Sequence, residues 1–312
     1  MAAKYPDYED WAVQLAYNYT GSELRDGEWF ALTQKINGVR ATSFANELVS
    51  RGGKIFKGLR HIEKELLLLR NALFEQSSIK FDFDGELRIA DKYIAGLTDN
   101  EAFKLSVGLA NSSVNMQGKE KLQYIIFDIL KTSEFQINTC SAKYTQRFDW
   151  LSIVDYVINK LNLKYIKIVP IVYHGKDKSQ IDTWFEYANN QGWEGLMINR
   201  DMPYVYTRTK GLLKIKKFDT LDLKIVGYTQ GTGKYEHTLG ALACKFRDDI
   251  VYVGTGFDDA TRDLLWAQRD HLEGKLCEVK YKDITYDKTT SLPSLQFPVF
   301  ICLKTDKFRA DA

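Results

Sequence analysis

The sequence predicts an α+β fold in two domains, residues 1–218 and 219–312. Three observations support this prediction. The length of 312 residues exceeds that of one average domain. Up to residue 218, amphipathic helical patterns alternate with apolar strand patterns, whereas short strands and glycine-containing turns dominate from residue 219. The apolar fraction of 45% is sufficient for a packed core in each domain.

The first domain shows both helix and strand periodicity. The clearest helix, residues 60–76, places Ile62, Leu66, Leu69 and Leu73 on one face. Further helices are expected at residues 8–17, 148–161 and 179–190. Strands are expected at residues 30–32, 79–89, 122–130, 165–173, 193–199 and 211–218. Residues 90–120 show no pattern that assigns them to an element.

The second domain contains five short strand patterns and one helix pattern. The strands are expected at residues 223–228, 239–246, 250–253, 277–281 and 299–303, and the helix at residues 259–271. Five strands, one helix and glycine-bearing turns within this length are typical of a small β-barrel of the oligonucleotide-binding (OB) kind.

Composition narrows the class of protein. No apolar run approaches the length of a membrane span, so no membrane partner is expected. The four cysteines are scattered without paired spacing, which predicts buried thiols in a reducing, cytoplasmic compartment. The net charge of +2 means that contact with nucleic acid must come from local basic clusters.

Two segments of the first domain carry candidate chemistry. In Thr33-Gln-Lys-Ile-Asn-Gly-Val-Arg40, Lys35 ends a strand, and Asn37-Gly38 is predicted to form a tight turn because both residues tolerate positive φ. Lys35 is a candidate nucleophile, and a solvated lysine is the alternative. In Ser50-Arg-Gly-Gly-Lys54, backbone amides beside two cations suit a phosphate, whereas an ordinary glycine hairpin is the alternative.

Lys35 belongs to a longer array of short motifs. The array continues with Arg40, Asp84-Gly85-Glu86, Phe127-Asp128, Glu194-Gly195 and Lys214-x-Lys216. In this order it resembles the nucleotidyltransferase motifs of the covalent ligase and capping-enzyme superfamily. The downstream motifs, ending in Ser294-Leu-Gln-Phe-Pro-Val-Phe300 and Lys304-Thr-Asp-Lys307, are similar to those of ATP-dependent DNA ligases. The resemblance covers about residues 30–307 and implies a nucleotidyltransferase (adenylation) domain of antiparallel sheets with helices, followed by an OB-fold β-barrel domain.

The resemblance implies a role for each motif. Lys35 would form a P–N bond to AMP, with nucleotide contacts from Thr33, Gln34, Arg40, Glu86, Phe127, Lys214 and Lys216. Glu194, together with Glu86, would hold Mg²⁺ or Mn²⁺. Ser50, Arg51 and Lys54 would contact the 5′-phosphate of a DNA nick, and Lys304, Asp306 and Lys307 would serve the pyrophosphate step. ATP, the metal ion and nicked duplex DNA are therefore the expected cofactors and partner of a monomeric enzyme.

The array also departs from the family pattern. Asn37 stands where the family usually has aspartate, Gln296 replaces a basic residue, and Lys304 replaces an arginine. The short N-terminal segment before Lys35 predicts a minimal ligase of the bacteriophage or viral type. An RNA ligase of the same superfamily, a capping guanylyltransferase and a non-catalytic nucleic-acid-binding protein are the alternatives.

Overall fold

The computed structural model describes residues 11–44, 47–112, 117–216, 219–281, 283–287, 290, 292–304 and 310–311. The chain divides into two compact units, Met1–Lys216 and Lys217–Ala312, whereas the sequence analysis placed the boundary after residue 218. Each unit is described by itself.

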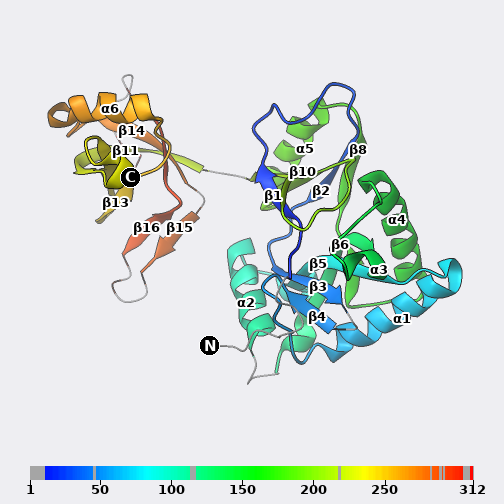
Figure 1. Ribbon diagram of the computed structural model, residues 1–312. Coiled ribbons are helices and arrows are strands. Elements are labelled where there is room, and N and C mark those ends of the chain that lie inside the picture. The colour runs from blue at the N-terminus through cyan, green and yellow to red at the C-terminus, as the bar shows by residue number, and fades with distance from the viewer. Residues whose placement is uncertain are drawn as a thin grey trace. The chain divides into compact units, whose positions relative to one another are not determined.

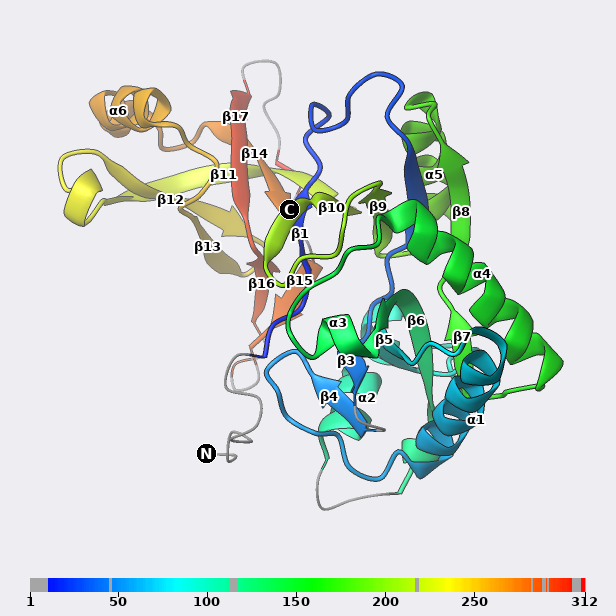
Figure 2. The same cartoon turned by 45° about the vertical axis from the view of Figure 1, so that its right-hand side comes forward.

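The first unit contains two five-stranded sheets (Figures 1 and 2). One sheet has the order β4-β3-β5-β6-β7 and is formed by Glu47–Ser50, Val39–Phe44, Phe81–Ile89, Leu122–Lys131 and Ile166–Ile168. The other has the order β1-β10-β9-β2-β8 and is formed by Leu15–Asn18, Arg208–Lys216, Gly195–Arg200, Phe30–Gln34 and Ile171–Gly175. Most neighbouring strands are antiparallel, as expected, but β6–β7 and β1–β10 are parallel pairs.

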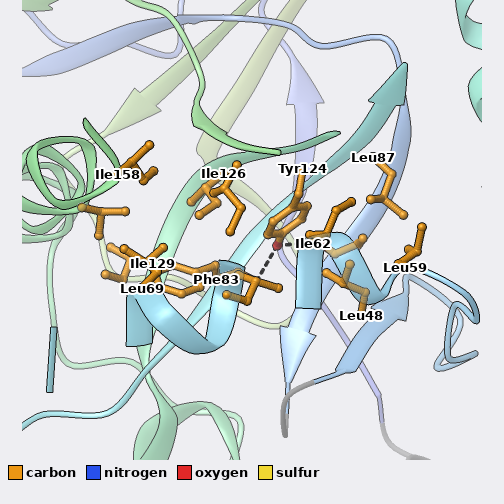
Figure 3. Close-up of a cluster of buried hydrophobic side chains, with 14 of the residues drawn as sticks. Leu48, Leu59, Ile62, Leu69, Phe83, Leu87, Tyr124, Ile126, Ile129 and Ile158 are labelled. Atoms are coloured by element: carbon orange, nitrogen blue, oxygen red, sulfur yellow. Dashed lines mark hydrogen bonds between the residues drawn. The ribbon is translucent and has the colours of Figure 1, made fainter. Parts of the chain in front are cut away.

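The larger core lies against the β3–β7 sheet. Two helices, α1 (Arg60–Ser77) and α4 (Tyr144–Lys160), lie next to each other and pack on this sheet (Figure 1). The four predicted apolar positions of α1 are all buried in this core. Figure 3 shows the ring of Tyr124 inside the cluster, where its hydroxyl lies 3.0 and 2.9 Å from the carbonyl oxygens of Ala41 and Phe83. The phenol therefore ties three neighbouring strands together within an apolar environment.

A second, smaller core lies under the other sheet. Helix α5 (Ser179–Asn190) has the predicted bounds and packs on β8 and β9. Ile181 and Ala188 of this helix join buried side chains from β2, β9 and β10. This packing fixes the end of β2, which Lys35 directly follows, and the start of β9, which Glu194 directly precedes.

Three predictions for the first unit are wrong. Leu15–Asn18 is not helical: it forms β1 by pairing with the edge of β10, and residues 8–10 lie outside the described residues. The single strand expected at residues 165–173 is two strands in different sheets, because Pro170 lacks the N–H that a continuous ladder requires. Asn37 and Gly38 do not adopt positive φ.

The unassigned segment before β6 contains further helices. Helix α2 (Asp99–Asn111) begins with a capping box between Thr98 and Glu101, a sequence signal that can be recognised without the structure. Short 3-10 turns at Asp91–Tyr93 and Lys119–Lys121 lie on either side, and α3 (Thr132–Phe135) follows β6.

The second unit is a five-stranded sheet with one α-helix and a hairpin. The sheet order is β13-β12-β11-β14-β17, formed by Asp249–Val253, Leu239–Phe246, Asp219–Gln230, Leu276–Tyr281 and Val299–Lys304. Helix α6 (Asp259–Ala267), followed by a 3-10 turn at Arg269–His271, covers the core, and a further 3-10 turn at Gly233–Tyr235 precedes β12. The Phe300 N–H of β17 donates to the Thr255 carbonyl oxygen, and the Thr255 hydroxyl donates to the Pro298 carbonyl oxygen, each at 2.8 Å. Because Thr255 closely follows β13, these bonds bring together the two edge strands of the sheet, β13 and β17. The sequence analysis missed the hairpin β15–β16 (Asp283–Tyr286 and Pro293–Gln296).

The described cysteines are free thiols. Cys244 and Cys277 are buried in the core of the second unit, whereas Cys140 and Cys302 are only partly buried. None of the helices in the described ranges combines the length and apolar character needed to cross a membrane.

Candidate active site

A cavity of about 260 Å³ lies between the two sheets of the first unit. Its lining comes from β1, β2, β9 and β10 on one side and from β3, β5 and β6 on the other. The structure brings together in its wall the predicted residues Thr33, Gln34, Lys35, Arg40, Arg51, Glu86, Phe127, Lys214 and Lys216. Glu194 joins them through Lys35 and Lys216.

Lys35 and Lys216 share one carboxylate. Lys35 Nζ donates to Glu194 Oε2 at 2.5 Å, and Lys216 Nζ lies 3.1 Å from Glu194 Oε1. Burial alone would raise the pKa of Glu194, but the charges of Lys35 and then Lys216 outweigh burial and hold this pKa below its ordinary value. The carboxylate therefore stays ionised and orients the Lys35 amine.

Two glycines place these charges. A Cβ on Gly195, whose φ is +146°, would lie 2.0 Å from the Ile215 carbonyl oxygen, so only glycine lets β9, which Glu194 directly precedes, begin this close to β10. The Gly195 carbonyl also accepts the Lys35 backbone N–H at 3.0 Å. A Cβ on Gly38 would lie 2.6 Å from both Glu86 Cγ and the Leu87 carbonyl oxygen. Gly38 is thus required by close packing, not by positive φ.

The opposite wall is held by an ion pair and two rings. Arg40 binds the buried carboxylate of Asp84 through Nε, at 2.6 Å, and through Nη2. The Arg40 guanidinium carbon lies 4.6 Å from the centre of the Phe127 ring. Tyr204 donates from its hydroxyl to Asp84 at 2.6 Å and accepts the backbone N–H of Gln14 at 2.8 Å. Arg40 is thereby fixed over Phe127 at the cavity wall.

The cavity shifts the pKa of two further side chains. Burial raises the pKa of Glu86 to about 7, although Arg40 and Lys35 partly oppose the rise. Burial, followed by the charge of Lys216, lowers the pKa of Lys214. The site thus combines a carboxyl group that titrates near neutrality with a cluster of cations, an arrangement suited to phosphate chemistry.

The donor set fits a magnesium ion that takes most ligands from water and phosphate. Glu86 and Glu194 supply carboxylate oxygens at one cavity, and Mg²⁺ is often bound by one or two carboxylates together with substrate phosphates. In the described part of the chain, no group of three or more His, Cys, Asp or Glu side chains forms a cage by itself.

The remaining predicted residues are not in the lining of this cavity. Ser50 and Lys54 belong to the turn that carries Arg51, but they are not in its lining. Lys304 lies on β17 of the second unit, 2.9 Å from Glu278 and 3.8 Å from Asp222. Asp306 and Lys307 lie outside the described residues.

Sequence analysis missed several lining residues. Gln14, Tyr204, Met197 and Asn199 all contribute to the wall. The strand position of Met197 and Asn199, close after Glu194, is a signal that could have indicated them. Gln14 and Tyr204 carried no such signal, because they meet across 190 residues of sequence.

Comparison with known proteins covers both units. Residues 230–304 match the family described as the DNA ligase OB-like domain. The chain is 23% identical over 274 residues to a DNA ligase of Haemophilus influenzae, which covers 88% of this chain and 87% of that protein. The chain also matches 37% of the length of a DNA ligase of Methanobrevibacter smithii, at 29% identity over 209 residues and 60% of this chain.

Solved structures show the same fold. The structure named Pmar-Lig_PreS3 has a TM-score of 0.69 and 27% identity, over 94% of this chain and 67% of that chain. The ATP-dependent DNA ligase from bacteriophage T7, solved in complex with ATP, has a TM-score of 0.54 and 17% identity, over 94% and 98% of the two chains. The predicted fold class is confirmed: a mixed α+β adenylation domain is followed by an OB-like domain.

Proposed function

We infer that this chain is an ATP-dependent DNA ligase that seals nicks in duplex DNA. The observation that carries this inference is the position of Lys35 in a cavity that is also lined by Lys214, Lys216, Arg40 and Phe127, with Glu194 bonded to the Lys35 amine. The similarity to DNA ligases over both units adds support. The role of each site residue in the reaction is our proposal.

In the first step, the Lys35 amine attacks the α-phosphorus of ATP. A P–N bond forms, the bond to the bridging oxygen of the β-phosphate breaks, and pyrophosphate leaves; the amine proton is released to water. Glu194 orients Nζ, while Lys214 and Lys216 oppose the charge that develops on the phosphate. Phe127 and Arg40 hold the nucleoside, with Thr33 and Gln34 beside it. A magnesium ion held by Glu194 and Glu86 would add positive charge at the phosphates.

In the later steps, AMP passes from Lys35 to the 5′-phosphate of the nick. The 3′-hydroxyl then attacks this activated phosphate, the phosphodiester forms and AMP leaves. Arg51 lines the same cavity as Lys35, which supports a role for its guanidinium in binding the 5′-phosphate, with Ser50 and Lys54 in the same turn.

The other assignments rest on the motif resemblance. Lys304, Asp306 and Lys307 serve the pyrophosphate step, and the OB-like unit contributes to duplex binding. The enzyme acts as a monomer in the cytoplasm, or in the host cytoplasm if a virus or bacteriophage encodes it. Mn²⁺ can replace Mg²⁺.

Labelling with ATP that is radioactive at the α-phosphate tests the proposal, because this phosphate stays on the enzyme when pyrophosphate leaves. With magnesium, the purified chain should acquire AMP covalently, and Lys35→Ala or Lys35→Arg should abolish labelling because neither offers a neutral amine. Lys210→Ala is the matched control, since Lys210 is an exposed lysine on β10 outside the cavity lining. Persistent labelling of Lys35→Ala would place the nucleophile elsewhere. Labelling by GTP in place of ATP would indicate a capping enzyme. In a sealing assay, faster sealing of nicked RNA than of nicked DNA would indicate an RNA ligase.

A further inference from the structure

The segment that carries Lys35 is tied to helix α2 by one side chain. Four residues, 35–38, connect β2 to β3. The Lys35 N–H bonds to the Gly195 carbonyl, Ile36 is buried, and Gly38 packs against β5. Asn37 Nδ2 donates to Asp99 Oδ2 at 2.7 Å, across 62 residues of sequence. This bond is the tie between the segment and α2.

Asp99 is held from two directions. Its Oδ1 lies 3.1 Å from Arg88 Nη2 of β5, so each carboxylate oxygen has its own donor. It is the first residue of α2, directly after the Thr98 cap, where a negative charge is favoured by the helix dipole. Asp99 is therefore a fixed acceptor, and residue 37 must supply a donor.

An aspartate at position 37 could not supply that donor when ionised. Two carboxylates about 3 Å apart repel each other and keep one proton between them. The side chain at position 37 is thus matched to the side chain at position 99. This gives a physical reason for the asparagine that departs from the family pattern at this position.

We propose that Asn37 is a positioning residue for the Lys35 reaction, through its hydrogen bond to the Asp99 carboxylate that Arg88 anchors. The proposal rests on the proposed function. Asp99 also lines a second cavity of about 590 Å³, whose other charged residues are Arg88 and the Asp91–Lys167 pair, 3.2 Å apart.

Single-turnover AMP labelling of Asn37→Asp, Asn37→Ala, Asp99→Asn and the double variant Asn37→Asp/Asp99→Asn tests the proposal. Loss of a hydrogen bond to a charged group should slow labelling by Asn37→Asp and Asn37→Ala about tenfold to a hundredfold at about pH 8. The double variant should recover to within about threefold of Asp99→Asn, since the amide introduced at position 99 can donate to the carboxylate introduced at position 37. Asn111→Asp, at the exposed end of α2, is the control for an added carboxylate.

The pH profile separates positioning from a general loss of structure. Relative to the unchanged chain at each pH, the Asn37→Asp deficit should shrink by about tenfold between about pH 8 and pH 6, because a shared proton restores the donor. The Asn37→Ala deficit should stay constant. The inference is overturned if Asn37→Asp labels as fast as the unchanged chain, if its deficit is as constant as that of Asn37→Ala, or if the double variant remains as slow as Asn37→Asp. Failure of the unchanged chain to label would instead refute the proposed function.

Discussion

Replacing Glu86 by glutamine should stabilise the first unit above neutral pH, and the size of the effect follows from the raised pKa. An unfolded glutamate has an ordinary pKa of about 4.5, whereas burial raises the pKa of Glu86 to about 7 in the folded protein. Between these values the folded state retains a proton that the unfolded state has lost, so stability falls as pH rises through this range. The contribution of this proton is fully present below about pH 4.5 and lost above about pH 7. At 1.36 kcal/mol per pKa unit, the total loss is about 3 kcal/mol.

The assay is urea unfolding in EDTA at several pH values, without nucleotide. Tryptophan fluorescence follows the first unit, because five of the six tryptophans lie before residue 217. The free energy of unfolding of Glu86→Gln minus that of the unchanged chain should rise between about pH 4.5 and 7 and then level off. Glu186→Gln is the control, since Glu186 is exposed on α5. Parallel pH curves for the unchanged chain and Glu86→Gln would refute the reasoning.

Three further outcomes are expected. Arg147→Met should lower the free energy of unfolding in urea by about 3–5 kcal/mol. The Asp128 carboxylate, which lies 2.7 Å from Arg147 Nε in the unchanged chain, would be left buried without a cation; an unchanged unfolding midpoint would contradict this. Thr98→Ala removes the N-cap of α2 and should lower the free energy of unfolding by about 1 kcal/mol in the same measurement. A stabilised variant would show that the cap is not formed. Arg51→Ala should slow AMP transfer from the labelled enzyme to nicked DNA more than Lys54→Ala does, because only Arg51 lines the cavity; equal rates in a single-turnover transfer assay would argue against this placement.

Much of this fold follows from short-range patterns. The apolar stripe of α1 and the bounds of α5 were predicted because each helix has one face turned to a sheet. Leu15–Asn18 was assigned wrongly because its conformation depends on a partner strand almost 200 residues later, which local periodicity does not report. Pro170 was a visible signal that the predicted strand should be divided in two.

In the site too, residues in local motifs could be predicted, whereas residues that meet only in the folded chain could not. Lys35, Glu194 and Lys216 were candidates from their motifs, and the structure places them in contact. Tyr204 was not a candidate, because its role in holding Asp84 arises only when distant segments meet. Asp99 was hidden for a similar reason: its helix begins inside a segment that the sequence left unassigned.

The described strands of the first unit change from one sheet to the other only twice along the chain, and one of these passages carries Lys35. Residues 35–38 lead from β2 to β3, and residues 169–170 lead back from β7 to β8. Lys35 then meets Glu194, 159 residues further along the chain, and Lys216 after it. Contacts of such long range cost more loop-closure entropy than local contacts, so we expect them to form after the intervening β3–β7 sheet. Under the proposed function, a chain still emerging from a ribosome would acquire AMP only once β10, which carries Lys216, is available, so the earliest AMP labelling would mark completion of the first unit.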